Sequence, residues 1–231
     1  STICDDRTCL TSFVDLDKTC ESIAKFSAKD AETYRKFAEK SLAMMPMIFQ
    51  GLFVPPPPQG VFWSLLDQSQ EGQFLMQAMQ RSMLDLVNQM FENEKVKIHF
   101  TKFGCELFVS PDERGTGAIL ATLPGFMHAT SPGIPIGGSA ALVNSLIRCL
   151  ESFGADIRHS SEVKKVTVEN GRATGVELVS GEKFAADTCV IGQIHPWLLS
   201  SMVDGLDPVL VENAKNTITS RFIVMANHYA L

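Results

Sequence analysis

The most regular alternation of apolar and polar residues lies in the carboxy-terminal half of the chain. Valines alternate with polar residues in 164–169, and residues 172–179 return with the same alternation. The dipeptide Asn170-Gly171 between them is typical of a two-residue hairpin turn, because both of its positions need a positive φ. Ser180-Gly181 indicates a second turn. The pattern therefore predicts a three-stranded antiparallel meander.

Helix and strand patterns flank this meander on both sides. Gly138-Ser139 begins a predicted helix and Gly154 ends it, because glycine adopts the left-handed cap conformation without strain. Residues 155–159 are expected to form the next strand. The apolar run within 187–191 predicts a strand that is covered on both faces. The predicted inner face of the helix consists of Leu142, Val143, Leu146, Ile147 and Leu150.

Residues 1–136 are predicted to be mainly helical. A short, partly apolar segment over 8–14 predicts a strand before the first helices. Ser27 begins a helix with one apolar stripe, and Pro46 is expected to kink or end that helix near its last turn. The run Pro55–Pro58 predicts an extended polyproline connector, since it fits neither a helix nor a central strand.

A second helical stretch, over 71–92, has apolar residues on more than one side. We interpret its methionines mainly as core residues, because methionine fills irregular gaps. The sharper alternative is a pliable wall for a long apolar substrate. An exposed version of the same surface would indicate membrane or partner contact. The methionines in question are Met76, Met79, Met83 and Met90.

The segment 104–138 is rich in glycine and proline and has no strong periodicity. A stretch of this kind is unusual in a compact domain unless it shapes a site, so we expect a functional loop here. The two halves of the chain change character at this segment. Beyond the meander, 208–216 is predicted to be a helix and 221–231 a strand that returns to the first region.

Composition narrows the function classes. The 231 residues are 45% hydrophobic, enough for a proper core, and the net charge of −6 argues against a nucleic-acid surface. No apolar run approaches the length needed to span a bilayer. Six dispersed cysteines indicate reduced structural thiols rather than a metal site, and favour a reducing, cytoplasmic location. A membrane-peripheral location is the alternative if the ligand is carried in lipid. The chain begins at Ser1, which we interpret as a processed product or an excised piece.

Several motifs, in a defined order, are similar to a known family. They are Pro135-x-Gly137-Gly138-x-x-x-Leu142, Gly154-Ala155-x-Ile157, Glu162-Val163, Asn170-Gly171-Arg172-Ala173-Thr174-Gly175-Val176, Gly181-Glu182 and Ala186-Asp187-x-x-Val190. Their order and spacing resemble the phytoene desaturase-like family of FAD-dependent oxidoreductases, relatives of carotenoid isomerases and retinol saturases. A parallel strand interrupted by a small meander is an organisation used by one class of flavin-binding sheet.

The resemblance implies an α+β (α/β) fold. A helical and antiparallel-sheet substrate-binding or cap region (1–136) is expected to join a partial FAD-binding region with the meander (137–198), and 199–231 to return to the first region. The Gly-x-Gly-x-x-Gly turn that holds the FAD pyrophosphate is missing, since Gly115-x-Gly117 follows no apolar strand and lacks the third glycine. We therefore expect an incomplete and inactive fragment of the enzyme, with the remainder of the FAD domain missing.

The resemblance also implies roles for individual residues. The backbone of Val163, with Glu162 and Lys164 beside it, is expected to meet the adenine end of FAD. Gly192 is expected at the carboxyl end of its strand, where it permits close approach of the cofactor; an ordinary sheet valine and a simple turn are the alternatives. Substrate-binding candidates are Gly137, Gly138, His128, Met76, Met79 and Met83.

The leading hypothesis is therefore part of a flavin-dependent oxidoreductase. Its substrate would be lipophilic and isoprenoid-like, and would undergo desaturation, saturation or isomerisation through hydride exchange with the flavin. No catalytic acid or base is assigned, and none of the histidines has metal-ligand spacing. The alternative hypothesis is a non-catalytic module that binds an apolar ligand or a partner protein.

Overall fold

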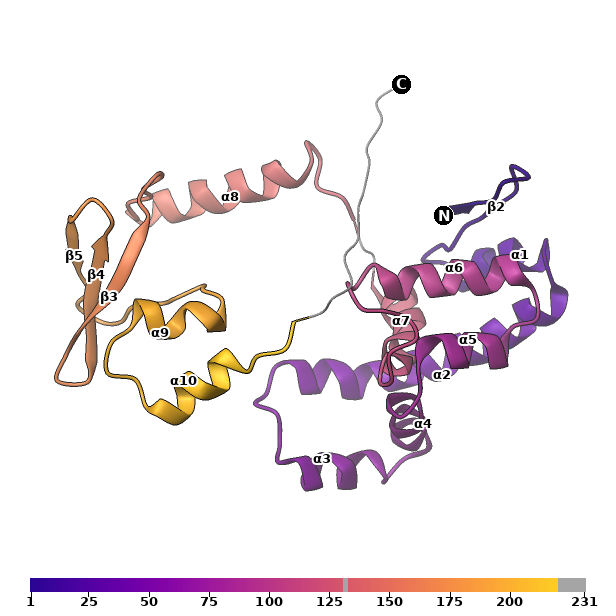
Figure 1. Ribbon diagram of the computed structural model, residues 1–231. Coiled ribbons are helices and arrows are strands. Elements are labelled where there is room, and N and C mark those ends of the chain that lie inside the picture. Colours follow the sequence, from indigo (N-terminus) through magenta and orange to yellow (C-terminus); the bar gives the residue numbers. More distant parts are fainter. Residues whose placement is uncertain (131–132, 220–231) are drawn as a thin grey trace. The chain divides into compact units, whose positions relative to one another are not determined.

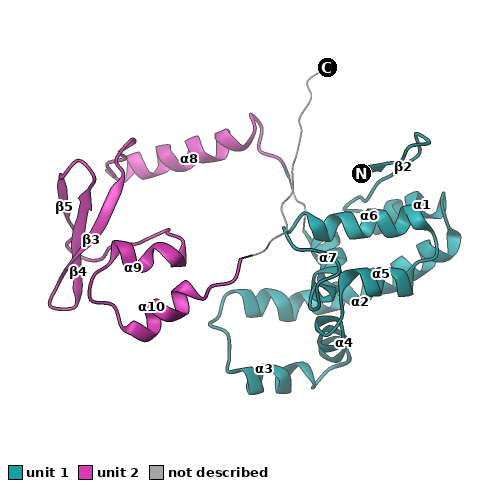
Figure 2. Ribbon diagram, in the orientation of Figure 1, with its two compact units in different colours: residues 1–133, 220–231 teal, residues 134–219 magenta. Residues whose placement is uncertain are grey.

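The computed structural model describes residues 1–130 and 133–219, and its fold is α+β, as predicted. The chain forms two compact units, 1–133 and 134–219, which Figure 2 shows in different colours. The predicted roles of these regions as cap and FAD-binding parts stay predictions. The predicted strand over 221–231 lies outside the described residues. None of the described helices combines the length and the apolar character that crossing a bilayer requires.

The first unit is mainly helical (Figure 1). Its strands are β1 (Thr2–Ile3) and β2 (Cys9–Leu10), which pair antiparallel. The predicted strand over 8–14 is thus confined to two residues. The helices of the unit are α1 (Leu16–Ala24), α2 (Ala28–Leu52), α3 (Gln59–Leu66), α4 (Gln70–Met79), α5 (Met83–Met90), α6 (Glu94–Cys105) and α7 (Gly117–Ala129).

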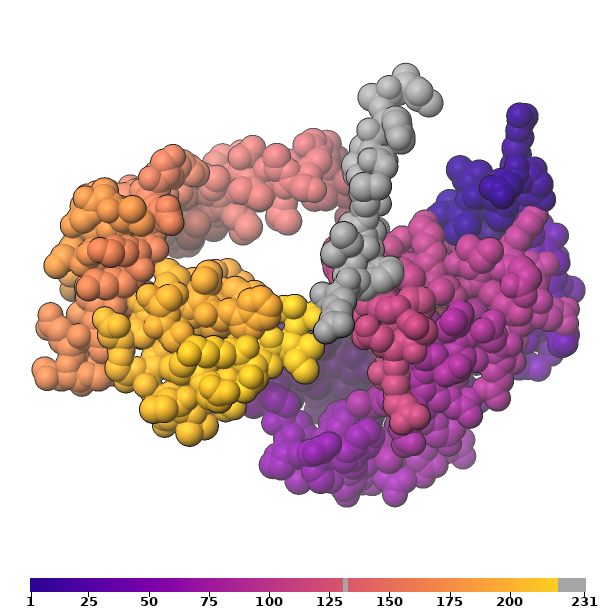
Figure 3. Space-filling model, in the orientation of Figure 1, coloured from indigo at the N-terminus to yellow at the C-terminus, as the bar shows by residue number. Residues whose placement is uncertain are grey.

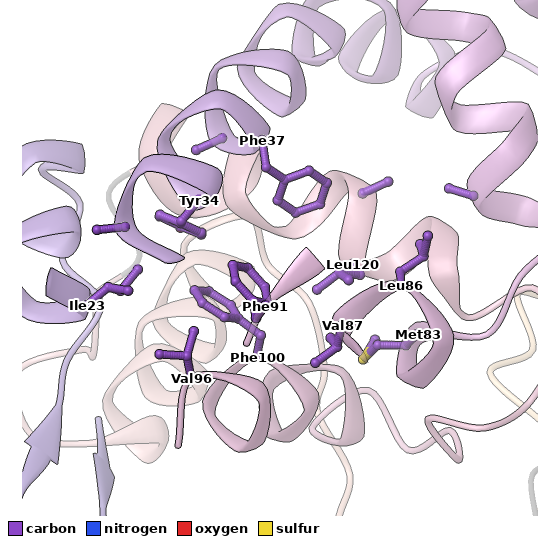
Figure 4. Close-up of a cluster of buried hydrophobic side chains, with 14 of the residues drawn as sticks. Ile23, Tyr34, Phe37, Met83, Leu86, Val87, Phe91, Val96, Phe100 and Leu120 are labelled. Carbon is purple, nitrogen blue, oxygen red and sulfur yellow. The ribbon is translucent and has the colours of Figure 1, made fainter. Parts of the chain in front are cut away.

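An aromatic stack lies at the centre of the core of this unit (Figure 4). The ring of Phe100 lies between Tyr34, at a centroid distance of 4.7 Å, and Phe91, at 5.0 Å, and both pairs are nearly parallel. Tyr34, Phe100 and the neighbouring Val87 and Leu120 are fully buried. The stack therefore joins helices α2, α5, α6 and α7 through one cluster.

Helix α2 begins where the sequence predicts. The Ser27 side chain accepts a hydrogen bond from the Asp30 backbone N–H at 3.1 Å and caps the helix. The buried Asp30 carboxylate in turn accepts hydrogen bonds from the backbone N–H groups of Glu92 and Asn93, both at 2.9 Å. The Asp30 carboxylate therefore provides the hydrogen-bond acceptors for two backbone N–H groups in the turn between α5 and α6. Pro46 lies inside α2, which continues to Leu52, so the alternative that it ends the helix is wrong and the alternative of a kink stays a prediction.

Two other helix predictions are wrong. The stretch 71–92 is not one helix, because Ser82 and Asp85 form a capping box that begins α5 and separates it from α4. The glycine- and proline-rich segment 104–138 is not a loop throughout, since α7 lies within it and packs along α2. Glycines of α7 allow this close packing, so their presence does not mark a loop there.

Gly125 shows how closely α7 approaches α2. Its N–H donates to the Ser41 hydroxyl at 2.8 Å, and a Cβ at this position would lie 2.7 Å from the Ser41 carbonyl oxygen. We expect Gly125→Ala to lower the free energy of unfolding by about 1–3 kcal/mol, because the backbone of α2 must shift. Gly51 lies in α2 itself, and a Cβ added there would meet no atom within 4 Å. Gly51→Ala should therefore leave the free energy of unfolding unchanged or raise it by up to about 1 kcal/mol. Urea unfolding followed by circular dichroism distinguishes the two; equal losses would refute the close-packing argument.

The second unit contains the predicted meander. Strands β3 (Val163–Glu169), β4 (Arg172–Leu178) and β5 (Lys183–Ala185) pair antiparallel in the order β3-β4-β5. Asn170 and Gly171 have φ values of 50° and 75°, as the predicted turn requires. The other elements are α8 (Ser139–Ser152), a 3₁₀ turn (Pro196–Leu198), α9 (Leu199–Met202) and α10 (Pro208–Lys215), the last of which confirms the helix predicted over 208–216.

Helix α8 also confirms its predicted bounds, and Gly154 follows it with φ of +79°. Its predicted inner face is wrong, because no residue of α8 is buried and Leu142, Val143, Leu146 and Leu150 are exposed. Neither 155–159 nor 187–191 forms a strand. A parallel strand needs a neighbouring strand to accept and donate its backbone hydrogen bonds, and the described residues of this unit supply none for these segments.

Candidate functional site

The predicted adenine contact lies at the beginning of β3. Val163 pairs with Leu178 of β4, and the Glu162 carbonyl accepts a hydrogen bond from the Val179 N–H at 2.9 Å. Val163 is half-buried, whereas Glu162 and Lys164 are exposed. Because β3 is at the edge of the meander, its outer backbone groups face away from β4. Val166 forms an isolated parallel bridge with Val203 on this side, so the part of the edge that can bind another strand or a planar ligand edge is the beginning of β3, near Val163.

A bulge in β3 gathers basic side chains around one carboxylate. The register shifts between Val163 and Lys165, so consecutive residues do not simply alternate between the two faces of the sheet. The Lys164 Nζ lies 3.4 Å from Glu177 Oε1, and the Nζ atoms of Lys165 and Lys183 lie 3.8 and 3.7 Å from Oε2. Three ammonium groups share this carboxylate. Together these four side chains carry a net positive charge.

The electrostatics of Glu177 reflect this crowding. Partial desolvation acts to raise the pKa of its carboxyl group, but Lys165, Lys164 and Lys183 outweigh desolvation and hold the pKa below its usual value. The carboxylate thus keeps its charge as pH falls toward its ordinary pKa. The excess of lysines leaves a net positive charge that can attract an anionic group, with a strength that depends on salt.

This cluster carries a testable prediction. Glu177→Gln removes the shared carboxylate, so repulsion among the three lysines should lower the thermal midpoint of the second unit. Added NaCl should restore much of the loss through screening. Trp197 fluorescence in a Trp63→Phe background reports this unit, since the Trp197 indole N–H donates to the Thr217 carbonyl at 2.9 Å. Glu169→Gln, at the exposed end of β3, is the control; the same salt-dependent loss there would contradict the role of the cluster.

The glycine candidates lie in open backbone. Gly137 and Gly138, with φ of +89° and +80°, precede α8, and the Gly138 carbonyl accepts from the Ala141 N–H at 3.0 Å. Gly192 is exposed, and a Cβ there would meet nothing closer than 3.8 Å. No hydrogen bond among the described residues joins these glycines to the beginning of β3. The structure thus brings together Glu162, Val163 and Lys164 only.

His128 has both ring nitrogens engaged in the first unit. Nδ1 lies 2.8 Å from the Val14 carbonyl, which can only accept, so Nδ1 carries the proton. Nε2 then accepts a hydrogen bond from the Tyr34 hydroxyl, also at 2.8 Å. A substrate would reach this imidazole only by displacing one of these partners.

The methionines divide between core and surface. Met83 is fully buried against Gly104, where a Cβ would lie 1.9 Å from its Cε, which agrees with the preferred core interpretation. Met76 and Met79 are half-buried beside the core. Met76 also lines a shallow groove of about 360 Å³, whose other residues are polar: Asp67, Gln73, Gln77 and Gln80. The predicted substrate roles of all three stay predictions.

A second shallow groove, between α5 and α6, was missed in the sequence. It has a volume of about 350 Å³ and is mostly apolar. The sequence pattern that could have indicated this groove is the spacing of Ile98, Thr101 and Cys105, which places them on one face of α6. Its lining residues include Leu84, Asn88, Lys97, Ile98, Thr101 and Cys105.

The fit to the expected flavin is partial. The edge of β3 offers backbone groups that can pair with an adenine, and the lysine cluster offers positive charge nearby. The described residues contain no strand followed by a Gly-x-Gly-x-x-Gly turn, so they form no cradle for the pyrophosphate. They therefore fit one end of the cofactor and not the whole of it.

Comparison with curated proteins reveals carotenoid-modifying relatives. The chain is 26% identical to a lycopene-forming phytoene desaturase of Pseudescherichia vulneris, over 71% of this chain and 32% of the relative. It is 44% identical to the all-trans-zeta-carotene desaturase of Myxococcus xanthus over 29% of this chain and 13% of the relative. It is 36% identical to the chloroplastic prolycopene isomerase of Daucus carota over 27% of this chain and 10% of the relative.

The resemblance to the phytoene desaturase-like family is confirmed. The chain spans about a third or less of the length of these phytoene desaturase-like relatives. No family model matches it. The relatives are named as desaturases and an isomerase, so they are enzymes.

Proposed function

We propose that this chain forms part of a flavin-dependent oxidoreductase that acts on a lipophilic, isoprenoid-like substrate. The observation that carries the proposal is the likeness to carotene desaturases and a prolycopene isomerase, together with a meander that follows a glycine-ended helix. In this proposal the second unit contacts the cofactor and the first unit contacts the substrate. When bound, the flavin supplies hydride exchange with a substrate carbon.

On the cofactor side, the chain contributes backbone rather than reactive side chains. The outer edge of β3 at Val163 binds the adenine end, and Gly192 lets the cofactor approach the main chain. The exposed apolar residues of α8 pack against the remainder of the flavin-binding layer, which supplies the pyrophosphate cradle. This arrangement explains why four large apolar side chains of α8 are exposed in the described unit.

On the substrate side, the first unit contributes apolar surface. Half-buried Met76 and Met79 adapt to an elongated hydrocarbon, because thioether side chains are flexible and polarizable. Met83 lies in the core of the same unit, and His128 joins α7 to α2 through its hydrogen bond with Tyr34. Gly137 and Gly138 leave the backbone open where the second unit begins.

Nucleotide binding tests the cofactor part. Since the chain holds only the adenine end, FAD and ADP should bind with similar affinity, whereas riboflavin should not bind; isothermal titration of each gives the answer. Val163→Pro removes one backbone N–H and restricts φ, and should weaken FAD and ADP binding at least about tenfold. Val163→Ile should leave binding unchanged. Trp197 fluorescence establishes that both variants remain folded.

The outcomes separate the two functional hypotheses. Binding of riboflavin but not ADP would contradict the proposed orientation of the cofactor. Binding of phytoene from detergent micelles, without any adenine nucleotide binding, would favour the non-catalytic module instead. The exposed face of α8 is the observation that keeps this second candidate open, since it is also suited to a partner protein.

A further inference from the structure

The first unit contains a long segment without any charged side chain. Residues 41–66 include no Asp, Glu, Lys, Arg or His, so all 20 basic and 26 acidic residues of the chain lie outside them. The segment covers the second half of α2, the connection to α3 and all of α3. A surface loop is normally polar. This absence of charge therefore needs a physical reason.

Much of this segment is exposed. Residues 50–61 are exposed apart from half-buried Pro57, and Phe53 has 86% of its surface accessible. Figure 1 shows α2 running out from the helices around its first half to the connection with α3, and Figure 3 shows this part of the surface in violet. We call the exposed apolar residues the apolar tip; they are Leu52, Phe53, Val54, Val61 and Leu65.

Helix α3 holds the apolar tip in place. Leu66 is buried, and Phe62 and Trp63 pack against the core while their rings contact each other edge to face at 5.7 Å. One side of α3 is therefore anchored, and Val61 and Leu65 on the same helix remain free. An anchored helix that presents apolar residues outward resembles an interfacial element rather than an unfolded loop.

We propose that the apolar tip inserts into the surface of a lipid bilayer. Two properties match this occupant. A hydrocarbon environment strongly disfavours charge, and insertion of this segment buries none. It also disfavours backbone N–H groups without a partner, and Pro55–Pro58 at the tip have no N–H. A protein partner would more commonly meet a charged or polar rim, which this segment does not provide.

Vesicle flotation tests the inference with the full chain. The chain should bind zwitterionic phosphatidylcholine vesicles and keep binding in about 0.5 M NaCl, since the tip carries no charge. Trp63 fluorescence, in a Trp197→Phe background, should shift to shorter wavelength on binding. The double variant Phe53→Asp/Leu65→Glu should lower the partition coefficient at least about tenfold, because two apolar anchors become charged.

The control is a matched pair elsewhere in the first unit. Leu107 and Phe108 are 55% and 58% exposed, similar to Leu65 at 52%, and they lie outside the uncharged segment. Leu107→Glu/Phe108→Asp should change partition less than about twofold. Circular dichroism and the urea midpoint establish that both double variants fold.

Three results would overturn the proposal. Equal losses in the two double variants would indicate general stickiness of the chain. Binding that requires anionic lipid and disappears in salt would indicate the lysine cluster of the second unit instead. A dimer that dissociates in the Phe53→Asp/Leu65→Glu variant, without vesicle binding by the original chain, would indicate an interface between copies. None of these measurements uses a flavin, so they stand apart from the test of the proposed function.

Discussion

Phe100→Ala should lower the free energy of unfolding of the first unit by about 3–5 kcal/mol. The phenyl ring is fully buried between Tyr34 and Phe91, and its removal loses both stacked contacts as well as the apolar area. Because the rings come from α2, from α6 and from Phe91 directly after α5, these elements cannot all close the cavity by small shifts. A loss of this size is a large fraction of the stability of a small domain.

Urea unfolding with two fluorescence probes measures the effect unit by unit. Trp63 reports the first unit and Trp197 the second, so the midpoint seen by Trp63 should fall and that seen by Trp197 should stay close to its original value. Phe53→Ala removes the same ring from a site that is 86% exposed and should change stability by less than about 0.5 kcal/mol. Similar losses for both substitutions would show that the aromatic stack is not the centre of the core.

The sequence predicted local structure well where local chemistry decides it. Asn170-Gly171 defines its hairpin turn because few other dipeptides tolerate two positive φ values, and Gly154 ends α8 for the same reason. Ser27 and Asp30 likewise identify the beginning of α2. These signals need only a few neighbouring residues, so a single sequence reveals them.

Predictions failed where distant residues decide the outcome. Residues 155–159 and 187–191 have strand-like patterns, but a strand forms only against a partner, which no local pattern reveals. Helix α7 was missed because Gly117 and Gly125 serve contacts with other helices, and glycine alone indicates a loop. The break before Ser82 was readable, since Ser82 and Asp85 have capping-box spacing.

The candidate site was only partly readable for the same reason. Motif resemblance indicated Glu162, Val163 and Lys164, which are adjacent in sequence and therefore adjacent in space. The sharing of Glu177 by three lysines depends on a bulge and on cross-strand register. Register follows from how β3, β4 and β5 align, so the cluster becomes visible only in the folded meander.

Acidification should destabilise the first unit through His99. Its imidazole is fully buried, with Nδ1 2.8 Å from the Thr2 hydroxyl and Nε2 2.8 Å from the Ser12 hydroxyl. Burial, with the nearby positive charges of the amino terminus and Lys102, lowers its pKa from 6.5 to about 3. The unfolded state therefore binds one more proton than the folded state between these values, and stability falls as pH falls through this window.

The size and range of this effect follow from the same pKa difference. Each pH unit within the window removes about 1.4 kcal/mol, so the free energy of unfolding should fall by roughly 2 kcal/mol between pH 6.5 and 5, and by about 4 kcal/mol or more toward pH 3. The effect of His99 is best measured in the upper part of this pH window. The carboxyl groups of Asp6, Glu32 and Glu92 have lowered pKa values, so they titrate at lower pH and contribute little there.

A pair of histidine substitutions isolates the contribution of this one imidazole. His99→Gln keeps a polar group between Thr2 and Ser12 but cannot titrate, so urea unfolding followed by Trp63 should show a flatter pH profile from 6.5 to 5, whatever its stability at neutral pH. His159→Gln replaces an exposed histidine of the second unit and should preserve the original slope. An unchanged slope in the His99 variant would mean that other groups carry the acid sensitivity. The slope, rather than the absolute stability, is decisive because the lost hydrogen bonds of His99 affect every pH equally, whereas proton uptake acts only within its own window.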